Sequence, residues 1–294
     1  MGTPEFAVES LKVLVENNCN VVGVVTAPDK PIGRGLKMGL SAVKEFSLIN
    51  LPNVPILQPE KLKDEAFLSE LKSLQADFQI VVAFRMLPEV VWNMPPKGTF
   101  NLHGSLLPNY RGAAPINWAI INGEKETGVT TFFLKHEIDT GSIIFQEKET
   151  ININDNVGDI YQRLMIKGAQ LVLKTVNAIA QNTVEATPQT LLGTEKHAPK
   201  IFKETCEIDW NKTRLEVHNF IRGLSPYPGA WTLLNGKVCK VYQTSLDSDI
   251  KSDKISSEMG EFGKCIDGFL QIEELQLEGK KRMNMGDFAR GYRA

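Results

Sequence analysis

Residues 100–115 read FNLHGSLLPNYRGAAP, and they place Asn101 and His103 near the end of a strand-like segment. Residues two positions apart in an extended chain project from the same face, so both side chains are expected to point into one cleft. Downstream, the run TGVTTFFLK predicts a second strand, and HEIDTG at His136–Gly141 follows it with Asp139 on a glycine-flanked turn. That turn can bring the Asp139 carboxylate to the same cleft.

These three residue types suit an acyl transfer that uses no metal. A nitrogen nucleophile that attacks a carbonyl group builds negative charge on the carbonyl oxygen, which the amide of Asn101 or an imidazolium of His103 can stabilise. The amine also loses a proton, and a His, or an Asp acting through water, takes it up with a rate gain of ~100-fold to 10,000-fold. Taken singly, each residue is better explained by a structural role: Asn101 as a turn cap, His103 as a half-buried histidine and Asp139 as a loop residue.

Taken together, residues 100–115 favour a catalytic role over a structural one, because they closely resemble the signature of the formyltransferases that use 10-formyltetrahydrofolate. In that family an Asn, a His and a later Asp form the catalytic set. The resemblance therefore implies that Asn101, His103 and Asp139 are catalytic in this chain. The residues that it implies as folate contacts are Ser105, Leu106, Leu107 and Pro108.

Within that family the chain is most similar to the members that formylate methionyl-tRNA, and the similarity covers nearly its whole length. The opening MGTPEFAVESLKVL matches their first loop and helix, with Thr3 expected as the N-cap and Pro4 at the first helical position. VVGVVTAPDKPIGRGLKM, at Val21–Met38, resembles their strand and the long loop that reaches the tRNA acceptor end. Between positions 28 and 44 the basic residues outnumber the acidic ones, of which Asp29 is the only example. This excess of positive charge suits contact with a phosphate backbone. These basic residues are Lys30, Arg34, Lys37 and Lys44.

The chain departs from this pattern at its start. Relatives usually have a short apolar strand directly before the segment that begins here at Met1. The resemblance implies a Rossmann-like domain, in which that first strand is central and contributes ladder hydrogen bonds to both neighbours. We therefore expect the first strand to be missing, and the sequence to be truncated at its N-terminus.

Length and composition agree with an ordinary enzyme of two domains. The chain has 294 residues, 42% of them hydrophobic, and a net charge of −2, which by itself does not indicate a nucleic-acid partner. The cysteines lack metal or redox spacing and are expected to be reduced packing residues. No run approaches the ~20 apolar residues of a membrane helix, so a cytoplasmic protein is expected. We also expect it to be monomeric.

Alternating helical and β-branched patterns over the first 180 residues predict an α/β domain with a parallel-rich sheet. A polar linker is predicted at 181–204, followed by a C-terminal domain at 205–294. The expected strands are Asn20–Thr26, Asp77–Phe84, Thr99–Leu102 and Val129–Leu134. The expected helices are Pro4–Glu16, Leu40–Leu48, Asp64–Leu74, Pro88–Trp92, Pro115–Ile121 and Val157–Ala180.

The C-terminal region has short strand-like pieces, and Asn235-Gly236 is a strong hairpin signal. The resemblance implies that this domain is an OB-like β-barrel, a fold that often binds nucleic acids. A basic tail makes the domain a candidate tRNA contact, although balanced charges leave a structural or dimer surface open. The tail's basic residues are Lys280, Lys281, Arg282, Arg290 and Arg293.

The reaction implied is attack by the α-amine of methionine, esterified to initiator tRNA, on the formyl carbon of 10-formyltetrahydrofolate. Two alternatives stay open: an enzyme that formylates an amino-sugar nucleotide, and a catalytically idle RNA-binding module. No metal is expected, because HEID at His136–Asp139 does not present two ligands on one helical face. Arg111, beside the folate segment, is expected chiefly to anchor the loop.

Overall fold

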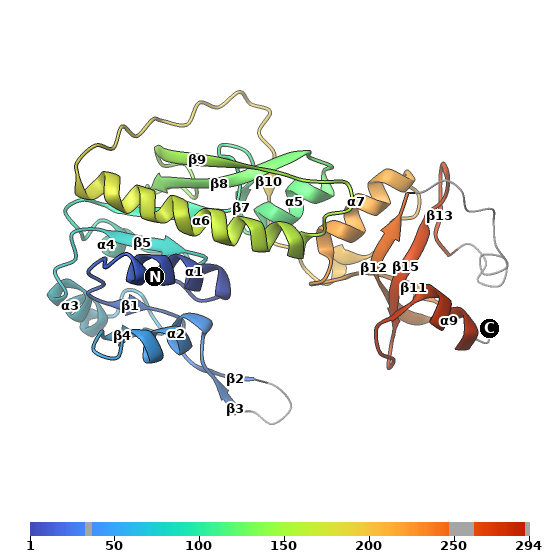
Figure 1. Cartoon of the computed structure of the whole chain (residues 1–294), viewed down its shortest axis with the longest axis horizontal. Helices are drawn as coiled ribbons and strands as arrows, with labels where there is room; N and C mark the ends of the chain where they lie inside the picture. Colours follow the sequence, from blue (N-terminus) through green and yellow to red (C-terminus); the bar gives the residue numbers. More distant parts are fainter. Residues whose placement is uncertain (33–36, 247–261, 292–294) are drawn as a thin grey trace. The chain divides into compact units, whose positions relative to one another are not determined.

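A computed structural model describes residues 1–32, 37–246 and 262–291 of the chain (Figure 1). Its internal contacts define two compact units, neither of which is one continuous segment. Unit 1 comprises Met1–Arg111, Gly128–Glu149 and Gln162–Lys196, and unit 2 comprises Gly112–Thr127, Thr150–Tyr161 and His197–Ala294. Of the predicted basic residues, Arg34 and Arg293 lie outside the described residues.

The main sheet of unit 1 has the strand order β5-β6-β8-β9 and is mixed rather than parallel-rich. β5 pairs with β6 in parallel, but β6 pairs with β8 antiparallel, because the chain crosses over between β5 and β6 and then reverses direction. A separate parallel pair is formed by β1 and β4. The strands are β1 (Val24–Val25), β4 (Ile56–Leu57), β5 (Gln79–Val82), β6 (Thr99–His103), β8 (Glu126–Phe133) and β9 (Ile143–Thr150).

Met1 and Gly2 lie between β1 and β5 and join these two strands. The Gly2 amide donates to the carbonyl of Val25 at 3.0 Å, and the Val82 amide donates to the carbonyl of Met1 at 3.0 Å. The ladder runs only as far as Met1. The predicted strand at Asn20–Thr26 is accordingly reduced to Val24–Val25, the part that has hydrogen-bonded neighbours.

The predicted helices of the first 180 residues all form, with ends shifted by a few residues at most. Thr3 is not the N-cap of the first helix, because Pro4 occupies that position and makes no side-chain cap bond. The helices are α1 (Glu5–Glu16), α2 (Ala42–Asn50), α3 (Glu65–Ser73), α4 (Glu89–Trp92), α5 (Pro115–Ile121) and α6 (Val157–Ala180). No helix in the described part of the chain is long and apolar enough to span a membrane.

α6 packs closely on the middle of the sheet (Figure 1). A Cβ on Gly168 would lie 2.8 Å from Leu102 Cδ2, so the glycine lets the helix approach β6 without displacing the Leu102 side chain. The Thr175 and Thr131 hydroxyls are 2.9 Å apart and tie the helix to β8. This contact buries the strand that carries the predicted site.

The loop predicted to reach tRNA begins and ends as a short hairpin of β2 (Lys30–Ile32) and β3 (Lys37–Gly39). Its base is fixed by Lys44, whose ammonium group donates to Asp29 Oδ2 at 2.5 Å and to Gln58 Oε1 at 2.6 Å. The hydrogen bond from Lys44 is the main cause that lowers the pKa of Asp29. Lys44 therefore has a structural role in the hairpin.

Unit 2 contains an antiparallel sheet of order β11-β12-β15-β16. The predicted hairpin at Asn235-Gly236 is confirmed, since both residues have positive φ, at 48° and 74°. Among the described residues no pairing closes this sheet into a barrel. The remaining elements are β7 (Arg111–Gly112), β10 (His197–Ala198), η1 (Glu204–Cys206), α7 (Arg214–Leu224), β11 (Ala230–Leu234), β12 (Lys237–Ser245), β13 (Lys264–Cys265), β14 (Gly268–Phe269), β15 (Gln271–Leu277), β16 (Met283–Asn284) and α9 (Met285–Gly291).

Three of the four cysteines lie in the core of unit 2 and have the packing role predicted for them. Cys206, Cys239 and Cys265 are buried among its aliphatic residues and carry free thiols. Burial raises the pKa of the Cys239 thiol to about 12 and that of Cys265 to about 11. The thiols therefore stay protonated and pack as small apolar groups.

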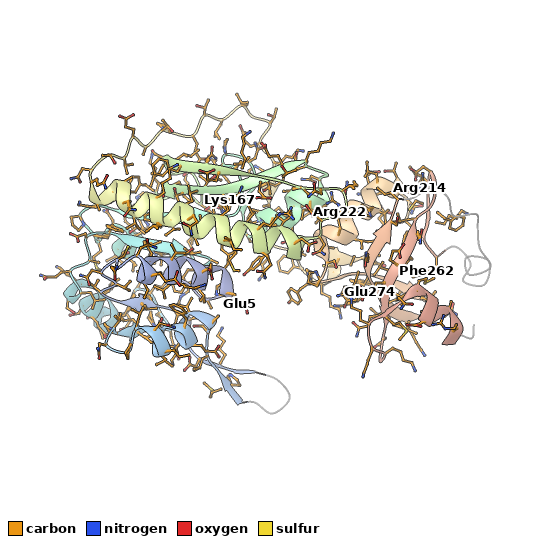
Figure 2. The ribbon with its side chains drawn as sticks, viewed as in Figure 1. Glu5, Lys167, Arg214, Arg222, Phe262 and Glu274 are labelled. Atoms are coloured by element: carbon orange, nitrogen blue, oxygen red, sulfur yellow. The ribbon has the colours of Figure 1, made fainter. Side chains whose placement is uncertain are left out.

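Two buried polar residues of α7 organise the loop that precedes α6 in unit 2. Arg222 (Figure 2) donates to the carbonyls of Asn152 and Asp155 at 3.1 and 2.8 Å. His218 Nε2 lies 2.9 Å from the carbonyl of Ile153, and burial lowers its pKa. These bonds satisfy carbonyls that would otherwise be buried without partners.

We predict that Gly223→Ala in α7 destabilises the protein, although alanine ordinarily favours a helix over glycine by up to ~1 kcal/mol. The added Cβ would lie 2.6 Å from Ile121 Cγ1 and 3.0 Å from the Ile121 amide nitrogen of α5. Overpacking of this kind costs about 1–3 kcal/mol. Urea unfolding measures the effect, with Leu215→Ala, a 49% exposed position of the same helix, as the control. A stabilised Gly223→Ala protein would contradict the close packing of α5 and α7.

Candidate active site

The end of β6 presents two of the predicted catalytic residues. Asn101 and His103 are two positions apart on this strand, opposite Phe132 and Thr130 of β8. Asn101 is half-buried, and His103 is 6% exposed. Their alternation along β6 is the one that the sequence predicts for two side chains on one face.

Two neighbours hold the imidazole of His103. Its Nε2 lies 2.8 Å from the carbonyl oxygen of Tyr110, and its ring meets Phe132 edge-on at a centroid distance of 6.5 Å. A carbonyl oxygen only accepts, so Nε2 carries a hydrogen and donates it. In the neutral ring Nδ1 then bears the lone pair.

Asp139 lies on the Nδ1 side of this ring. The Asp139 Oδ2 atom is 3.8 Å from His103 Nδ1, and both side chains are largely buried. This separation is too long for a direct hydrogen bond and leaves a gap that a water or a substrate nitrogen can bridge. The structure thus brings together the His and the Asp that the sequence singles out, across a narrow polar gap.

The turn after β6 is held in place by residues that the sequence analysis did not single out. Thr130 Oγ1 donates to the Ser105 carbonyl at 2.6 Å and accepts from the Leu107 amide at 3.2 Å. The Gln146 amide group donates to the Leu107 carbonyl at 2.8 Å. The turn contains a cis peptide bond between Leu107 and Pro108, and it delivers the Tyr110 carbonyl to His103.

The four residues predicted to contact folate divide into two kinds. Ser105 and Leu107 are buried, at 0% and 3% exposure, and the Ser105 hydroxyl donates to the Asn109 carbonyl at 2.7 Å. Leu106 and Pro108 are half-buried. The side chains that this turn offers to a ligand are therefore those of Leu106 and Pro108.

A glutamine of the predicted linker fixes the Asp139 turn. The Gln189 amide group donates to the carbonyls of Asp139 and Gly141 at 2.8 and 2.9 Å, while its oxygen accepts from Arg111 Nε at 3.1 Å. Asp139 itself has a φ of 55°, a left-handed conformation that Asp tolerates better than most residues. Arg111 thus has the anchoring role expected of it, although through Gln189 rather than by bonding carbonyls directly.

Space around this turn is also limited. A Cβ on Gly141 would lie 1.5 Å from the carbonyl oxygen of Phe133, so no other residue fits there without moving the turn. The sequence marked Gly141 only as a flank of Asp139. Gln189 carried no sequence signal, because its partners lie 48 to 78 positions away along the chain.

The basic residues predicted for tRNA lie in both units. Lys30 of β2 is exposed in unit 1, and Lys280 and Lys281 are exposed at the turn after β15 in unit 2. Arg282 is paired with Glu274, and its guanidinium carbon lies 4.2 Å from the Tyr242 ring centroid. Arg282 is therefore held against its own sheet.

His136 has structural neighbours on the surface. Its Nε2 lies 3.2 Å from Glu89 Oε2, and its ring meets Trp92 edge-on. Within the described ranges, no group of three or more His, Cys, Asp or Glu side chains is arranged to hold a metal ion.

Solved structures share this fold over nearly the whole chain. A crystal structure of WlaRD, a sugar 3N-formyl transferase, has a TM-score of 0.67 at 24% identity and covers 95% of this chain and 97% of its own. The N-formyltransferase from Helicobacter canadensis, solved with folinic acid and dTDP-3-aminofucose, gives a TM-score of 0.68 at 24% identity, with coverages of 96% and 97%. At this identity the likeness establishes the fold alone.

Curated relatives are much more similar in sequence. The methionyl-tRNA formyltransferase of Bacteroides thetaiotaomicron is 54% identical, with 100% of this chain and 94% of the relative covered. That of Phocaeicola vulgatus is 58% identical over the same shares. The family model described as formyl transferase matches residues 1–176, and the one described as formyl transferase, C-terminal domain, matches residues 200–293. With both models matched and relatives this similar along its whole length, the chain belongs to the formyltransferase family.

Proposed function

We propose that this formyltransferase moves the formyl group of 10-formyltetrahydrofolate to the α-amino group of initiator methionyl-tRNA, giving N-formylmethionyl-tRNA for translation initiation in the cytoplasm. The observation that carries the chemistry is the arrangement of His103, held through Nε2 with Nδ1 turned toward Asp139 at 3.8 Å. The observation that carries the substrate is the name shared by relatives that are 54% and 58% identical over the full chain.

In the proposed mechanism the methionyl amine attacks the formyl carbon, and the electron pair of the carbonyl π bond moves onto its oxygen. The Asn101 amide donates to this oxygen, and the imidazolium that forms when His103 takes up the amine proton also stabilises its negative charge. The amine proton passes to His103 Nδ1, directly or through a water in the gap beside Asp139. The bond from carbon to the folate nitrogen then breaks, that nitrogen takes the proton from the His103 imidazolium, and tetrahydrofolate leaves with His103 neutral again.

Two structural features support separate tasks for Tyr110 and Asp139. The Tyr110 carbonyl fixes the tautomer and the direction of the ring, so the orienting task falls to it rather than to Asp139. Asp139, on the other side of the ring, places a carboxylate where it stabilises the protonated imidazole. We therefore assign Asp139 chiefly to charge stabilisation and proton transfer.

We assign folate binding to the turn of residues 105–108. Leu106 and Pro108 offer half-buried apolar surface for a pterin ring or its linker, whereas Ser105 and Leu107 shape the turn from inside. Thr130 and Gln146 hold this turn on β8 and β9. A rigid turn suits recognition of a flat ligand, because little conformational freedom is lost on binding.

For the tRNA we propose contacts from the region of Lys30, Arg34 and Lys37 and from the turn with Lys280, Lys281 and Arg282. Exposed lysines at Lys30, Lys280 and Lys281 suit a phosphate backbone. We also propose that the sheet of unit 2 belongs to an OB-like domain spanning 205–294, joined to a catalytic domain of 1–180 by the linker 181–204. A monomeric enzyme would be sufficient for this scheme.

An amino-sugar nucleotide is the second candidate acceptor, because the solved structures of similar fold include sugar formyltransferases. The same donor and the same three residues would serve either amine. A direct assay separates them: labelled 10-formyltetrahydrofolate is mixed with methionyl initiator tRNA, uncharged tRNA or a 4-amino-sugar nucleotide. Formyl transfer to the charged tRNA alone is expected, and transfer to the sugar would overturn the proposed substrate.

Asn101→Ala is predicted to lower kcat by about 100-fold to 1,000-fold, since removing one donor to a developing oxyanion has that effect. Asp139→Ala is predicted to lower kcat by at least about 100-fold, the scale of general acid–base catalysis. Both proteins should unfold at the wild-type temperature in a thermal scan. Asn93→Ala, an exposed asparagine at the end of α4, is the matched control. A fully active Asp139→Ala protein would refute the assignment.

Gln189→Ala is predicted to lower kcat by roughly 10-fold to 100-fold, because misplacing a catalytic group by about 1 Å has such a cost. The variant removes both bonds to the Asp139 turn and the partner of Arg111. The neighbouring exposed Thr190→Ala should leave turnover unchanged. Wild-type kcat in Gln189→Ala would show that the turn keeps its position without this glutamine.

Replacing Lys280 and Lys281 together by Ala is predicted to weaken tRNA binding and to reduce the slope of log K against log salt by about one for each phosphate that is no longer neutralised. Filter binding at several salt concentrations measures both. Lys61 and Lys63, exposed lysines of unit 1, give a double variant of equal charge as the control. Equal salt slopes in the two double variants would exclude the turn after β15 as a tRNA contact.

A further inference from the structure

A pocket of about 430 Å³ lies in unit 2, and none of the residues proposed for formyl transfer lines it. Its lining comes from within residues 113–117 at the start of α5, residues 200–206, residues 227–231 at the start of β11, and Lys240 of β12. All of these residues belong to unit 2, so one compact unit forms the pocket by itself. Pockets that bind small ligands have volumes of roughly 300–1,000 Å³, so this pocket is large enough for such a ligand.

The charged side chains in this lining are all basic. They are Lys200, Lys203 and Lys240, and the lining includes no Asp or Glu from the described residues. None of the three ammonium groups forms an ion pair with another described residue. Three like charges gathered without a counter-ion repel one another and attract an anion. The pocket therefore favours a ligand with negative charge.

Lys240 is held in place at two points. Its ammonium group donates to the carbonyl of Pro228 at 2.8 Å. Its stem passes close to the backbone at Gly229, where an added Cβ would lie 3.2 Å from Lys240 Cδ. An ammonium group has three hydrogens, so two remain for a ligand. A cation held in this way loses little freedom when it binds a phosphate.

Exposed aromatic rings accompany the cations. Tyr227 is 82% exposed and Phe202 is 54% exposed, and both line the pocket. Tyr227 lies between Pro226 and Pro228, whose rings restrict the backbone on either side of it. Its side chain makes no hydrogen bond or ring contact within the described part of the chain. Tyr227 therefore offers an open face for stacking.

The segment that carries Phe202 is fixed as well. The Trp231 indole donates to the Lys203 carbonyl at 2.8 Å and ties this segment to β11. The Lys200 ammonium group lies 5.3 Å from the centroid of the Phe202 ring, within the range of a cation–π interaction. Phe202 thus already pairs with a cation, which leaves Tyr227 as the ring that can receive a ligand.

We propose that this pocket binds one nucleotide, with its base stacked on Tyr227 and its phosphate between Lys203 and Lys240. A flat aromatic group and a negative charge on one ligand match the exposed ring and the ammonium groups. Stacking on an aromatic side chain tolerates any base, because every base has a π face. The ligand is therefore a nucleotide of any base, either free or unpaired in an RNA strand. Only the RNA source rests on the proposed tRNA substrate.

Isothermal titration calorimetry of the full chain with AMP, UMP and penta-adenylate tests the site. Saturable binding is expected, and Tyr227→Ala should raise Kd by about 5-fold to 150-fold, the effect of losing one base stack. Tyr227→Phe keeps the ring and should bind like the wild type. The matched control is Phe269→Ala, since Phe269 of β14 is 46% exposed and does not line the pocket.

A second variant, Lys240→Met, keeps most of the stem and removes the charge. For penta-adenylate it should reduce the slope of log K against log salt by about 0.7, the value for one phosphate of a single strand. Lys237→Met, at an exposed position of the same strand, should leave the slope unchanged. Circular dichroism checks the fold of each variant. The exposed Tyr227 supports no core packing, so its variants test the site even where Lys240→Met fails to fold.

Binding of AMP and UMP would identify a free nucleotide as the ligand, and binding of penta-adenylate alone would identify RNA as its source; both results support the proposal. Absence of binding by all three, or an unchanged Kd in Tyr227→Ala, would overturn it. Inorganic phosphate that competes as tightly as AMP would also overturn it, because the base would then contribute nothing. These titrations contain no formyl donor, so their outcome is separate from a failure of the proposed formyl transfer.

Discussion

The hydrogen bond between His103 Nε2 and the Tyr110 carbonyl is the constraint on which the proposed site depends. It closes the turn of residues 104–110 on the strand from which that turn departs, and it decides which ring nitrogen is left for chemistry. Because the carbonyl only accepts, Nδ1 is directed to the gap beside Asp139. The bonds of Thr130 and Gln146 to the turn support this one contact from β8 and β9. The same framework gives the turn its rigid, half-buried outer surface.

Asp139 is positioned by longer-range interactions. A left-handed backbone, a glycine against the Phe133 carbonyl and a pair of bonds from Gln189 together define its turn. Gln189 is held in turn by Arg111, which follows directly on Tyr110. The two sides of the site are thus coupled, because the segment that orients His103 continues into the residue that anchors the Asp139 turn. Polar networks of this kind are rigid only while every member is satisfied.

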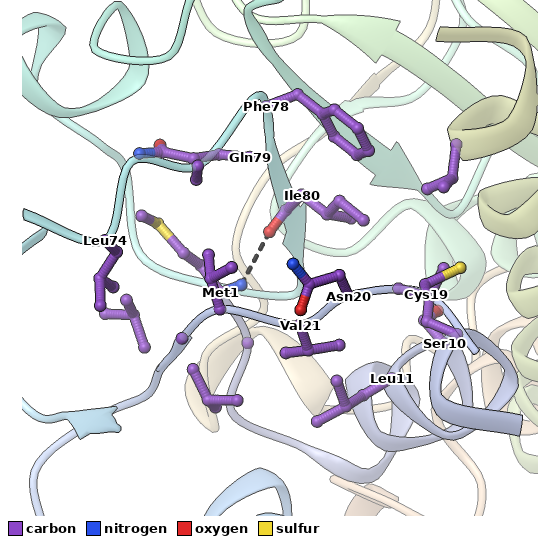
Figure 3. A pocket seen from close by; sticks show the side chains of 18 of the residues that line it. Met1, Ser10, Leu11, Cys19, Asn20, Val21, Leu74, Phe78, Gln79 and Ile80 are labelled. Atoms are coloured by element: carbon purple, nitrogen blue, oxygen red, sulfur yellow. Dashed lines mark hydrogen bonds between the residues drawn. The ribbon is translucent and has the colours of Figure 1, made fainter. Parts of the chain in front are cut away.

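The sheet of unit 1 is packed more tightly in its middle than near the start of β5. Its middle is closed by α6, which approaches β6 at Gly168, whereas an apolar cavity lies between residues 20–23 and the start of β5 (Figure 3). β5 borders both regions, since it pairs with β6 on one edge and with Met1 on the other.

The sequence alone determined the family resemblance, the helices of the first 180 residues and the alternation of Asn101 and His103, because short-range periodicity and a long motif carry that information. It was wrong on the parallel-rich sheet, because β8 runs antiparallel to β6, and on the cap of α1 and the extent of β1. Strand direction and length depend on neighbours that are distant in the chain. Tertiary structure alone decided which nitrogen of His103 faces Asp139, how Gln189 enters the site and that Arg282 is held by Glu274. The physical reason is that a hydrogen bond needs a partner at about 3 Å, and sequence separation does not reveal that distance.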